Sequence, residues 1–429
     1  MLTDAWYDLF YHKEQARLWR SKARFAAVTA GRGSGKTELA RRRIVLMLAQ
    51  RKPWPDPIYF YALPTFSQAK RVAWRPIKKL VPPEWLASPP KETELIIETV
   101  FGSTLYVIGM DKPHRVEGVQ WDGGVIDESS DQRPGIFNLN FLPAFSHRKA
   151  WCWRIGVPKR QGVGAPEFKA FFDLGKSGED PEIDSFTWPS RDILTPEELR
   201  FAMQNLDATD FSEQYEANWE KAGGRIFHAY DDVQNVKEVQ YSVNETILVG
   251  SDFNVNPMCW VLAHRRGNEI HVFDEMMVRD TNTVATLGQL AARYGTTHKG
   301  DWEFYGDAAG RARTTKADTT DYILIRNDNR FRHKRVYYPR ANPPLRARFA
   351  ACNAMFCNAA QERRVFIHPR CKRLRADLRD RAYDKDGVTP SDYGDMGHMS
   401  DGFGYIIHKL FPIRLVPTDD KQSVMVRHA

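Results

Sequence analysis

The chain has 429 residues, of which 42% are hydrophobic and 27% charged, and a formal net charge of +8. This length is typical of two or three domains, and this composition excludes a disordered chain. No apolar run approaches the ~20 residues that span a bilayer, and the N-terminus lacks the pattern of a signal peptide, so we expect no membrane partner. The positive charge favours a polyanionic partner such as nucleic acid.

A glycine-rich run joins a predicted strand at residues 25–29 to a predicted helix at residues 38–49, and it reads AGRGSGKT from Ala30 to Thr37. Backbone N–H groups in such a turn bind phosphate, helped by the helix dipole. Lys36 is placed to reach the β- and γ-phosphates, and Thr37 to hold magnesium. Ala30 replaces the usual first glycine and is small enough to keep the turn. The run therefore predicts ATP binding by Gly31, Arg32, Gly33, Ser34, Gly35, Lys36 and Thr37.

An acidic segment at residues 123–128 supplies the carboxylates that a nucleotide site needs in addition to the phosphate-binding loop. Asp127 is expected to hold magnesium and Glu128 to polarise the attacking water. Without the loop, these acids are also compatible with an ordinary strand that ends in solvent. Gln15, just ahead of the first strand, is a candidate for reading the adenine edge. Arg32 is placed to neutralise charge on the γ-phosphate.

Further predicted strands at residues 58–62, 105–108 and 151–156 alternate with helical stretches. This alternation predicts an α/β domain with a mostly parallel sheet and its ligand at the strand ends. We assign residues 1–175 to this core. Capping signals at Thr195 and Asp210 predict a helical linker at 176–223, which ends at a glycine pair.

The second half carries acids at the ends of predicted elements. Asp252 ends a strand at residues 246–253, Asp307 ends one at 303–307, and Asp401 opens a helix that runs to 410. Such acids can converge on two magnesium or manganese ions that cleave phosphodiesters. Unrelated surface acids are the alternative. Asp274 and Glu275 are weaker candidates than Asp307. We assign residues 224–411 to this mixed α/β domain and 412–429 to a tail.

Two other features are open to more than one interpretation. The five cysteines form no framework, which favours a reducing compartment, and Cys352 and Cys357 face apart on a predicted helix at 345–362. The segments 326–348 and 372–381 are rich in arginine. They suit a phosphate backbone, and equally a solvated charged surface.

Together, Gln15, the arginine-bearing loop, Asp127-Glu128, Asp252, Asp307 and Asp401 resemble the large terminase subunit of tailed bacteriophages, from residue 15 to 410. The resemblance implies a P-loop ATPase domain followed by a ribonuclease H-like nuclease domain with a mixed sheet. It assigns Gln15 to the adenine motif and Asp127 to magnesium. Glu128 and Arg32 are then the catalytic residues of the ATPase, and Asp252, Asp307 and Asp401 both ligands and catalytic residues of the nuclease.

The resemblance also implies a function. Such a subunit uses ATP and Mg²⁺ to translocate double-stranded DNA into a procapsid, and it cuts concatemers with Mg²⁺ or Mn²⁺. Its partners are DNA, the portal protein, the small terminase subunit and further copies in a ring of five. It acts in the host cytoplasm, transiently at the portal, and is absent from the mature virion. Gly156-Val157-Pro158 lacks the hydroxyl residue of the family's coupling motif, and Arg133 and Arg148 are candidates for an arginine that acts on a neighbouring subunit.

Two alternatives remain open. A helicase–nuclease of DNA repair or recombination shares both chemistries, although no further helicase motif follows residue 160. A packaging motor component whose acids no longer cut DNA is the other.

Overall fold

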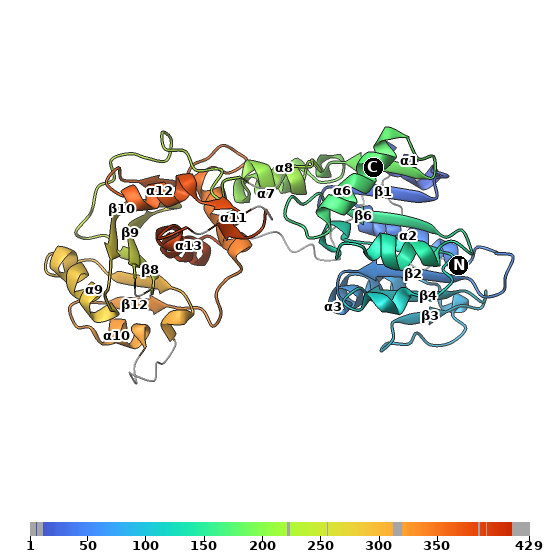
Figure 1. The fold of residues 1–429 in the computed structure, drawn as a ribbon, viewed down its shortest axis with the longest axis horizontal. Helices are drawn as coiled ribbons and strands as arrows, with labels where there is room; N and C mark the ends of the chain where they lie inside the picture. Colours follow the sequence, from blue (N-terminus) through green and yellow to red (C-terminus); the bar gives the residue numbers. More distant parts are fainter. Residues whose placement is uncertain are drawn as a thin grey trace. The chain divides into compact units, whose positions relative to one another are not determined.

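The computed structural model describes Trp6 and residues 12–220, 224–254, 256–311, 320–384, 387–391 and 393–413. The chain divides into two compact units, here called the N-terminal and C-terminal domains (Figure 1). The N-terminal domain takes residues 1–199 and 212–221, and the C-terminal domain residues 200–211 and 222–416. The boundaries expected at 175, 223 and 411 stay a prediction, and the predicted tail lies outside the described residues except for 412 and 413.

A seven-stranded sheet forms the centre of the N-terminal domain, in the order β3-β4-β2-β5-β6-β1-β7. All neighbouring strands are parallel except β3 with β4, so the predicted mostly parallel sheet is confirmed. β1 is apolar and buried along its whole length, as expected for a parallel strand covered on both faces. The strands are β1 (Phe25–Ala30), β2 (Ile58–Leu63), β3 (Ile96–Glu98), β4 (Thr104–Gly109), β5 (Gly123–Ile126), β6 (Trp151–Gly156) and β7 (Ile183–Trp188).

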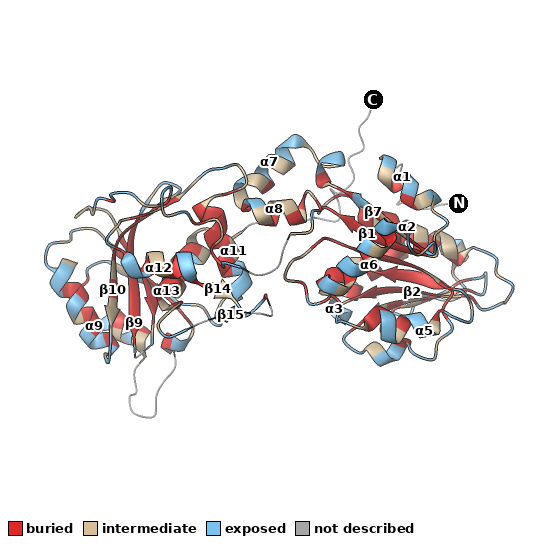
Figure 2. Ribbon diagram, turned by 45° about the horizontal axis from the view of Figure 1, so that its top comes forward, coloured by how far each residue is buried: buried red, intermediate tan, exposed pale blue. Residues whose placement is uncertain are grey.

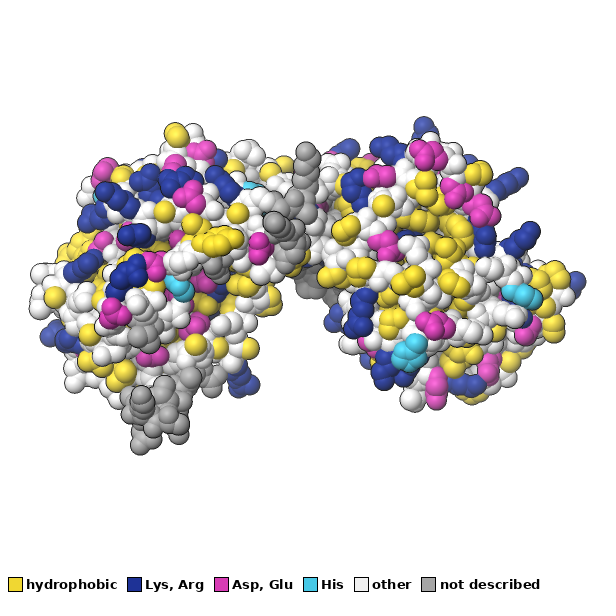
Figure 3. Space-filling view, in the orientation of Figure 1, with side chains coloured by type: hydrophobic (Ala, Val, Ile, Leu, Met, Phe, Trp, Pro, Cys, Tyr) yellow, Lys and Arg dark blue, Asp and Glu magenta, His cyan; other side chains and the backbone are white. Residues whose placement is uncertain are grey.

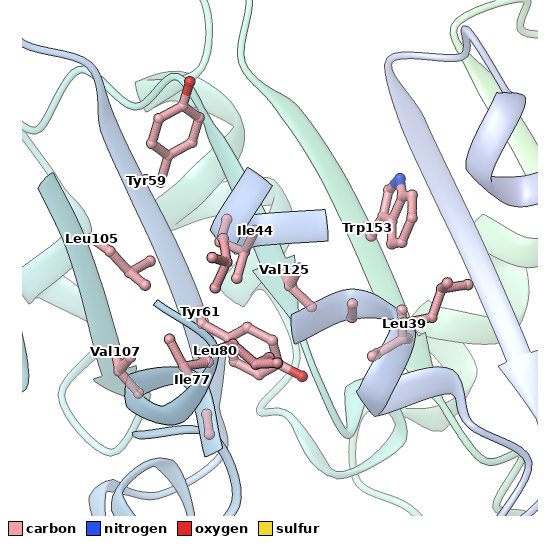
Figure 4. Close-up of a cluster of buried hydrophobic side chains, with 14 of the residues drawn as sticks. Leu39, Ile44, Tyr59, Tyr61, Ile77, Leu80, Leu105, Val107, Val125 and Trp153 are labelled. Carbon is pink, nitrogen blue, oxygen red and sulfur yellow. The ribbon is translucent and has the colours of Figure 1, made fainter. Parts of the chain in front are cut away.

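Helices cover both faces of this sheet. Neighbouring residues of β1, whose side chains point to opposite faces, belong to different hydrophobic clusters. Val28 packs in the cluster that contains Leu39 and Ile44 (Figure 4), whereas Ala27 packs against Phe168. The helices are α1 (Lys13–Arg20), α2 (Lys36–Leu48), α3 (Phe66–Gln68), α4 (Arg75–Leu80), α5 (Leu142–Ala144) and α6 (Ala165–Ser177). Two more helices, α7 (Pro196–Asn205) and α8 (Ala208–Gln214), each contain residues of both domains. Further helical segments are η1 (Ala69–Trp74), η2 (Pro83–Trp85), η3 (Pro113–Val116), η4 (Ser129–Asp131), η5 (Ile136–Phe141) and η6 (Ser190–Asp192).

The C-terminal domain is built on a six-stranded sheet in the order β12-β11-β8-β9-β10-β13. β8, β9 and β10 form an antiparallel meander, and β11, β12 and β13 join in parallel, so the predicted mixed sheet is confirmed. The strands are β8 (Ile247–Asp252), β9 (Met258–Arg266), β10 (Glu269–Val278), β11 (Trp302–Gly306), β12 (Lys334–Tyr337) and β13 (Val365–Ile367), and a separate hairpin pairs β14 (Ala382–Tyr383) with β15 (Pro390–Ser391).

Two helical layers enclose this sheet as well. One hydrophobic cluster contains Phe349, Leu374 and Phe403, and a second contains Leu287 and Ile325. Figure 2 shows the buried strands between partly exposed helices. The helices are α9 (Thr283–Leu290), α10 (Asp321–Asn327), α11 (Leu345–Phe356), α12 (Lys372–Asp380) and α13 (His398–Leu410), with the turns η7 (Ala291–Gly295) and η8 (Ala309–Arg311).

Helix α11 ends earlier than the helix predicted at 345–362. Cys352 is buried within α11, whereas Cys357 is the C-cap and is half-buried. All five cysteines are free thiols. Across the described parts of the chain, none of the helices is both long and apolar enough to cross a membrane.

Candidate active sites

The glycine-rich run, here called the phosphate loop, forms the turn between β1 and α2. Gly33 and Gly35 have φ angles of +66° and +79°, which side chains with a Cβ rarely adopt. The ammonium of Lys36 donates to the carbonyl of Gly31 at 3.3 Å, and the residue is only 8% exposed. Burial lowers the pKa of Lys36, against the opposing effect of Glu128 and Asp127. A buried cation beside a glycine turn at a helix N-terminus is a site for an anion such as phosphate.

Gln15 contacts this loop directly. Its side-chain amide donates to the carbonyl of Ser34 at 2.9 Å, and the indole N–H of Trp188 donates to the same oxygen at 3.0 Å. A Cβ on Gly35 would lie 2.9 Å from Gln15 Nε2, so glycine leaves room for this contact. In this structure Gln15 holds the loop backbone, and its predicted contact with adenine stays a prediction.

Arg32 points to the last residue of α8, Gln214. Its Nε donates to Gln214 Oε1 at 2.7 Å, and its backbone N–H donates to the Gln214 carbonyl at 2.6 Å. Ser190 Oγ donates to the Arg32 carbonyl at 2.6 Å. The loop arginine is therefore held by two later parts of the N-terminal domain, which the sequence did not indicate.

Asp127 faces the phosphate loop. Its Oδ2 accepts hydrogen bonds from Tyr61 at 2.7 Å and from Thr37 Oγ1 at 3.2 Å. Burial, followed by the charge of Glu128, raises the pKa of Asp127. A divalent cation would offset this unfavourable burial, because Asp127 and Thr37 offer oxygen ligands next to each other. Thus the structure brings together the two predicted magnesium contacts.

Glu128 follows directly and has a φ angle of +50°, in the left-handed region. Its carboxylate lies 3.2 Å from the ammonium of Lys159. Burial raises the pKa of Glu128, but the positive charges of Lys159, Lys36 and Arg32 outweigh it and the net pKa is lowered. Sequence reasoning missed both Tyr61 and Lys159, since neither belongs to the loop or to the acidic segment.

The two arginines considered for action on a neighbouring subunit differ. Arg148 pairs with Asp56 at 2.9 Å and with Asp122 at 3.0 Å, and its side chain is 9% exposed. Arg133 is exposed and follows Gln132, whose amide donates to the Asp127 carbonyl at 3.0 Å. The geometry thus gives Arg148 a structural contact within its own domain and leaves Arg133 at the surface.

In the C-terminal domain, Asp252 is the last residue of β8 and Asp307 directly follows β11, and these two strands are adjacent and parallel. β8 and β11 pair with Ser251 opposite Gly306, so the next residues of both strands lie at the same sheet edge. Burial, and then the nearby charge of Asp252, raises the pKa of Asp307. Two neighbouring, poorly solvated carboxylates are typical of a cation-binding site, because a bound cation stabilises their charged forms.

The third group beside these acids is His398, the first residue of α13. Its Nδ1 lies 2.8 Å from Asp252 Oδ2, and Asn254 Nδ2 donates to the same oxygen at 2.8 Å. The hydrogen bond to Asp252 raises the pKa of His398. Sequence reasoning did not single out His398. A histidine at a helix start, three residues before Asp401, was the only available signal.

Asp401 lies three residues further along α13, in a different environment. Its Oδ1 accepts from Arg381 at 2.7 Å and from Arg348 at 2.8 Å, and both arginines are buried. This oxygen is therefore directed to two guanidinium groups, and the expected role of Asp401 as a metal ligand stays a prediction. Among the described residues, no group of three or more His, Cys, Asp or Glu side chains is arranged to hold a metal ion.

Asp274 and Glu275 serve other contacts. Asp274 pairs with Arg293 at 3.1 Å and accepts from Tyr294 at 2.9 Å. Glu275 accepts from the backbone N–H groups of Arg373 and Leu374 at 2.8 Å each, and so caps the start of α12.

Helix α13 approaches β8 very closely. A Cβ on Gly250 would lie 2.2 Å from the Gly402 carbonyl oxygen, and a Cβ on Gly402 would lie 2.8 Å from the Gly250 carbonyl oxygen. The two elements that carry His398 and Asp252 are therefore packed backbone to backbone.

Basic side chains lie on the surface of the C-terminal domain. Figure 3 shows Lys and Arg side chains gathered on the visible face around α12, where Lys372, Arg373 and Arg379 are exposed. Arg375 and Arg379 pair with Asp232, at 3.1 and 3.6 Å. These pairs reduce the charge of the surface.

The structure is similar to solved structures of the large terminase from a thermophilic bacteriophage. One aligns with a TM-score of 0.59 and 13% identity, over 94% of this chain and 99% of that chain. The same terminase in complex with ADP gives 0.58 and 14% over 93% and 99%, and in complex with ATP-gamma-S 0.57 and 14% over 93% and 99%. No protein-family model and no curated protein matches the sequence. The resemblance to large terminases is confirmed at the level of the fold.

Proposed function

We propose that this chain is the large terminase subunit of a DNA-packaging motor. The observation that carries the proposal is the presence, in one chain with the large-terminase fold, of a phosphate loop next to Asp127 and of paired acids at the edge of a second sheet. The similar terminase forms complexes with ADP and ATP-gamma-S, which supports nucleotide binding here. The same proposal includes four partners, namely double-stranded DNA, a portal protein, a small terminase subunit and further copies of this chain in a ring. The experiments below test only the partner DNA.

In the N-terminal domain, the residues fit a magnesium–ATP complex. Lys36 and the loop N–H groups would bind the phosphates, and Thr37 and Asp127 would hold Mg²⁺. The metal supplies charge neutralisation on the phosphate oxygens. Glu128 would orient and deprotonate the attacking water, and Arg32 would stabilise the charge that develops on the γ-phosphate.

In the C-terminal domain, Asp252 and Asp307 would hold a divalent cation such as Mn²⁺ or Mg²⁺ from the ends of neighbouring strands, with His398 in contact with Asp252. Asp401 stays with its two arginines. The metal supplies an activated water and stabilises the leaving oxygen of the phosphodiester. Asn254 would keep the Asp252 carboxylate in place.

The test measures both activities in the full-length chain and in two variants, Glu128→Gln and Asp252→Asn. Glu128→Gln should lower ATP hydrolysis at least about 100-fold while it retains ATP binding and cleavage of supercoiled plasmid in Mn²⁺. Asp252→Asn should abolish cleavage and keep DNA-stimulated ATPase activity. Glu238→Gln, an exposed acid of the C-terminal domain, is the control.

The outcomes separate the alternatives. Plasmid cleavage by Asp252→Asn at the wild-type rate would contradict the nuclease site. Strand separation on a forked duplex would identify a helicase–nuclease. Mn²⁺ binding without cleavage by an ATP-hydrolysing wild-type chain would identify a motor component that does not cut DNA.

A further inference from the structure

Lys159 lies in the turn that follows β6, outside both motifs of the ATPase site. Its ammonium pairs with Glu128 at 3.2 Å and also pairs with Asp131, and the side chain is only 12% exposed. β6 is hydrogen-bonded to β5 on one side and to β1 on the other. The turn after β6 therefore lies between the end of the acidic strand and the phosphate loop.

Glu128 depends on its surroundings to keep its conformation. A φ angle of +50° is unfavourable for a residue with a side chain, and it persists only where neighbours hold it. Its carbonyl accepts from the Asp131 N–H at 2.8 Å, which fixes the backbone. The ion pair with Lys159 fixes the carboxylate.

The turn that carries Lys159 is itself anchored. The next residue, Arg160, donates to Glu213 through its backbone N–H at 2.6 Å and its guanidinium at 2.7 Å. Glu213 precedes Gln214, which holds Arg32 of the phosphate loop. A continuous series of contacts thus runs from Glu128 through Lys159, Arg160 and Glu213 to the loop.

We propose that Lys159 is a positioning residue for the Glu128 carboxylate in ATP hydrolysis. The proposal rests on the proposed ATPase function and adds to it a residue from neither nucleotide motif. Lys159 holds one carboxylate oxygen of Glu128, so the other stays directed at the water that attacks the γ-phosphate. A displacement of about 1 Å at a catalytic group costs up to roughly 100-fold in rate.

The experiment compares ATP hydrolysis by the full chain with that of Lys159→Met, Lys159→Gln and Lys159→Arg. Both neutral variants should lower kcat by roughly 10- to 100-fold. KM, and the affinity for a fluorescent ATP analogue, should change less than threefold. Lys159→Arg should recover most of kcat, because arginine retains a cation for Glu128. Lys169→Met is the matched control, since Lys169 pairs with Asp173 on the surface of the same domain.

Thermal unfolding of every variant shows whether it is folded, and Lys159→Gln, which keeps a hydrogen-bond donor, replaces Lys159→Met if that variant unfolds. An unchanged kcat in a folded neutral variant would overturn the proposal. A raised kcat would also overturn it, since the ion pair would then restrain Glu128. A loss confined to ATP affinity would make Lys159 a nucleotide ligand instead. Absence of ATP hydrolysis in the wild-type chain would overturn both the proposed function and the role of Lys159. Hydrolysis by the wild type with an unchanged kcat in the neutral variants would overturn only the role of Lys159.

Discussion

The imidazole of His398 lies 2.8 Å from the carboxylate of Asp252, although 146 positions separate them in the chain. The contact forms because α13 packs against β8, which ends at Asp252. Histidine and carboxylate side chains together are ligands for Mn²⁺ and related divalent ions. The C-terminal site is therefore defined by packing between a helix start and a strand end.

Replacing His398 with alanine should weaken Mn²⁺ binding by at least about 10-fold, because the Asp252 carboxylate loses the imidazole that contacts it. Plasmid cleavage should fall with it. Isothermal titration with Mn²⁺ measures the affinity. His408→Ala, on the last turn of the same helix, serves as control and should bind Mn²⁺ like the wild type. Equal Mn²⁺ affinity in both variants would remove His398 from the site.

Asp401→Asn should act on stability and not on metal binding. The change removes the negative charge between two buried arginines and should lower the free energy of unfolding by about 2 kcal/mol. Urea unfolding measures this value. Asp395→Asn breaks a more exposed pair with Arg279 and should cost less than about 1 kcal/mol. A normal stability together with a loss of Mn²⁺ affinity would return Asp401 to the ligand set.

Tyr61→Phe should raise the Mg²⁺ concentration needed for half-maximal ATP hydrolysis, by about 10-fold. Tyr61 donates to Asp127 Oδ2, and hydroxyl partners of a metal ligand typically influence affinity by this amount. Tyr59→Phe is a matched control on the same strand, because the buried Tyr59 hydroxyl has no hydrogen-bond partner among the described residues. Hydrolysis is measured across a magnesium titration, and identical curves for the two variants would contradict this role.

Arg148→Ala should destabilise the N-terminal domain by about 2 kcal/mol, since Asp122 is fully buried and loses its guanidinium partner. The ATPase activity of the folded protein should stay within about twofold of wild type. Arg133→Ala, at an exposed position, should leave stability unchanged. Denaturant unfolding and ATPase assays on both variants check this. An ATPase defect in Arg148→Ala at normal stability would favour the action on a neighbouring subunit.

The sequence was sufficient where the chemistry is local. The phosphate loop and Asp127 belong to short contiguous patterns, and the mostly parallel sheet follows from strands that alternate with helices. Asp252 and Asp307 were predictable as strand-terminal acids, because parallel strands bring their ends to one edge.

The residues that sequence analysis missed depend on tertiary packing. Tyr61 points at Asp127 only because β2 lies beside β5, and Lys159 reaches Glu128 only because β6 lies beside β5. The contacts of Asp401 with Arg348 and Arg381 likewise join distant parts of the chain, so no local pattern indicates them. β7 was not predicted, because its alternating pattern is that of an edge strand with polar positions.

The contact between Gly250 and Gly402 decides how the C-terminal site responds to change elsewhere. Since the backbones of β8 and α13 approach each other at Gly250 and Gly402 with no room for a Cβ, the two glycines set the distance between the elements that carry Asp252 and His398. Replacements among the large core residues can alter the volume around the site and leave this spacing intact. Even alanine at position 250 would clash with the Gly402 carbonyl oxygen and increase the distance between β8 and α13.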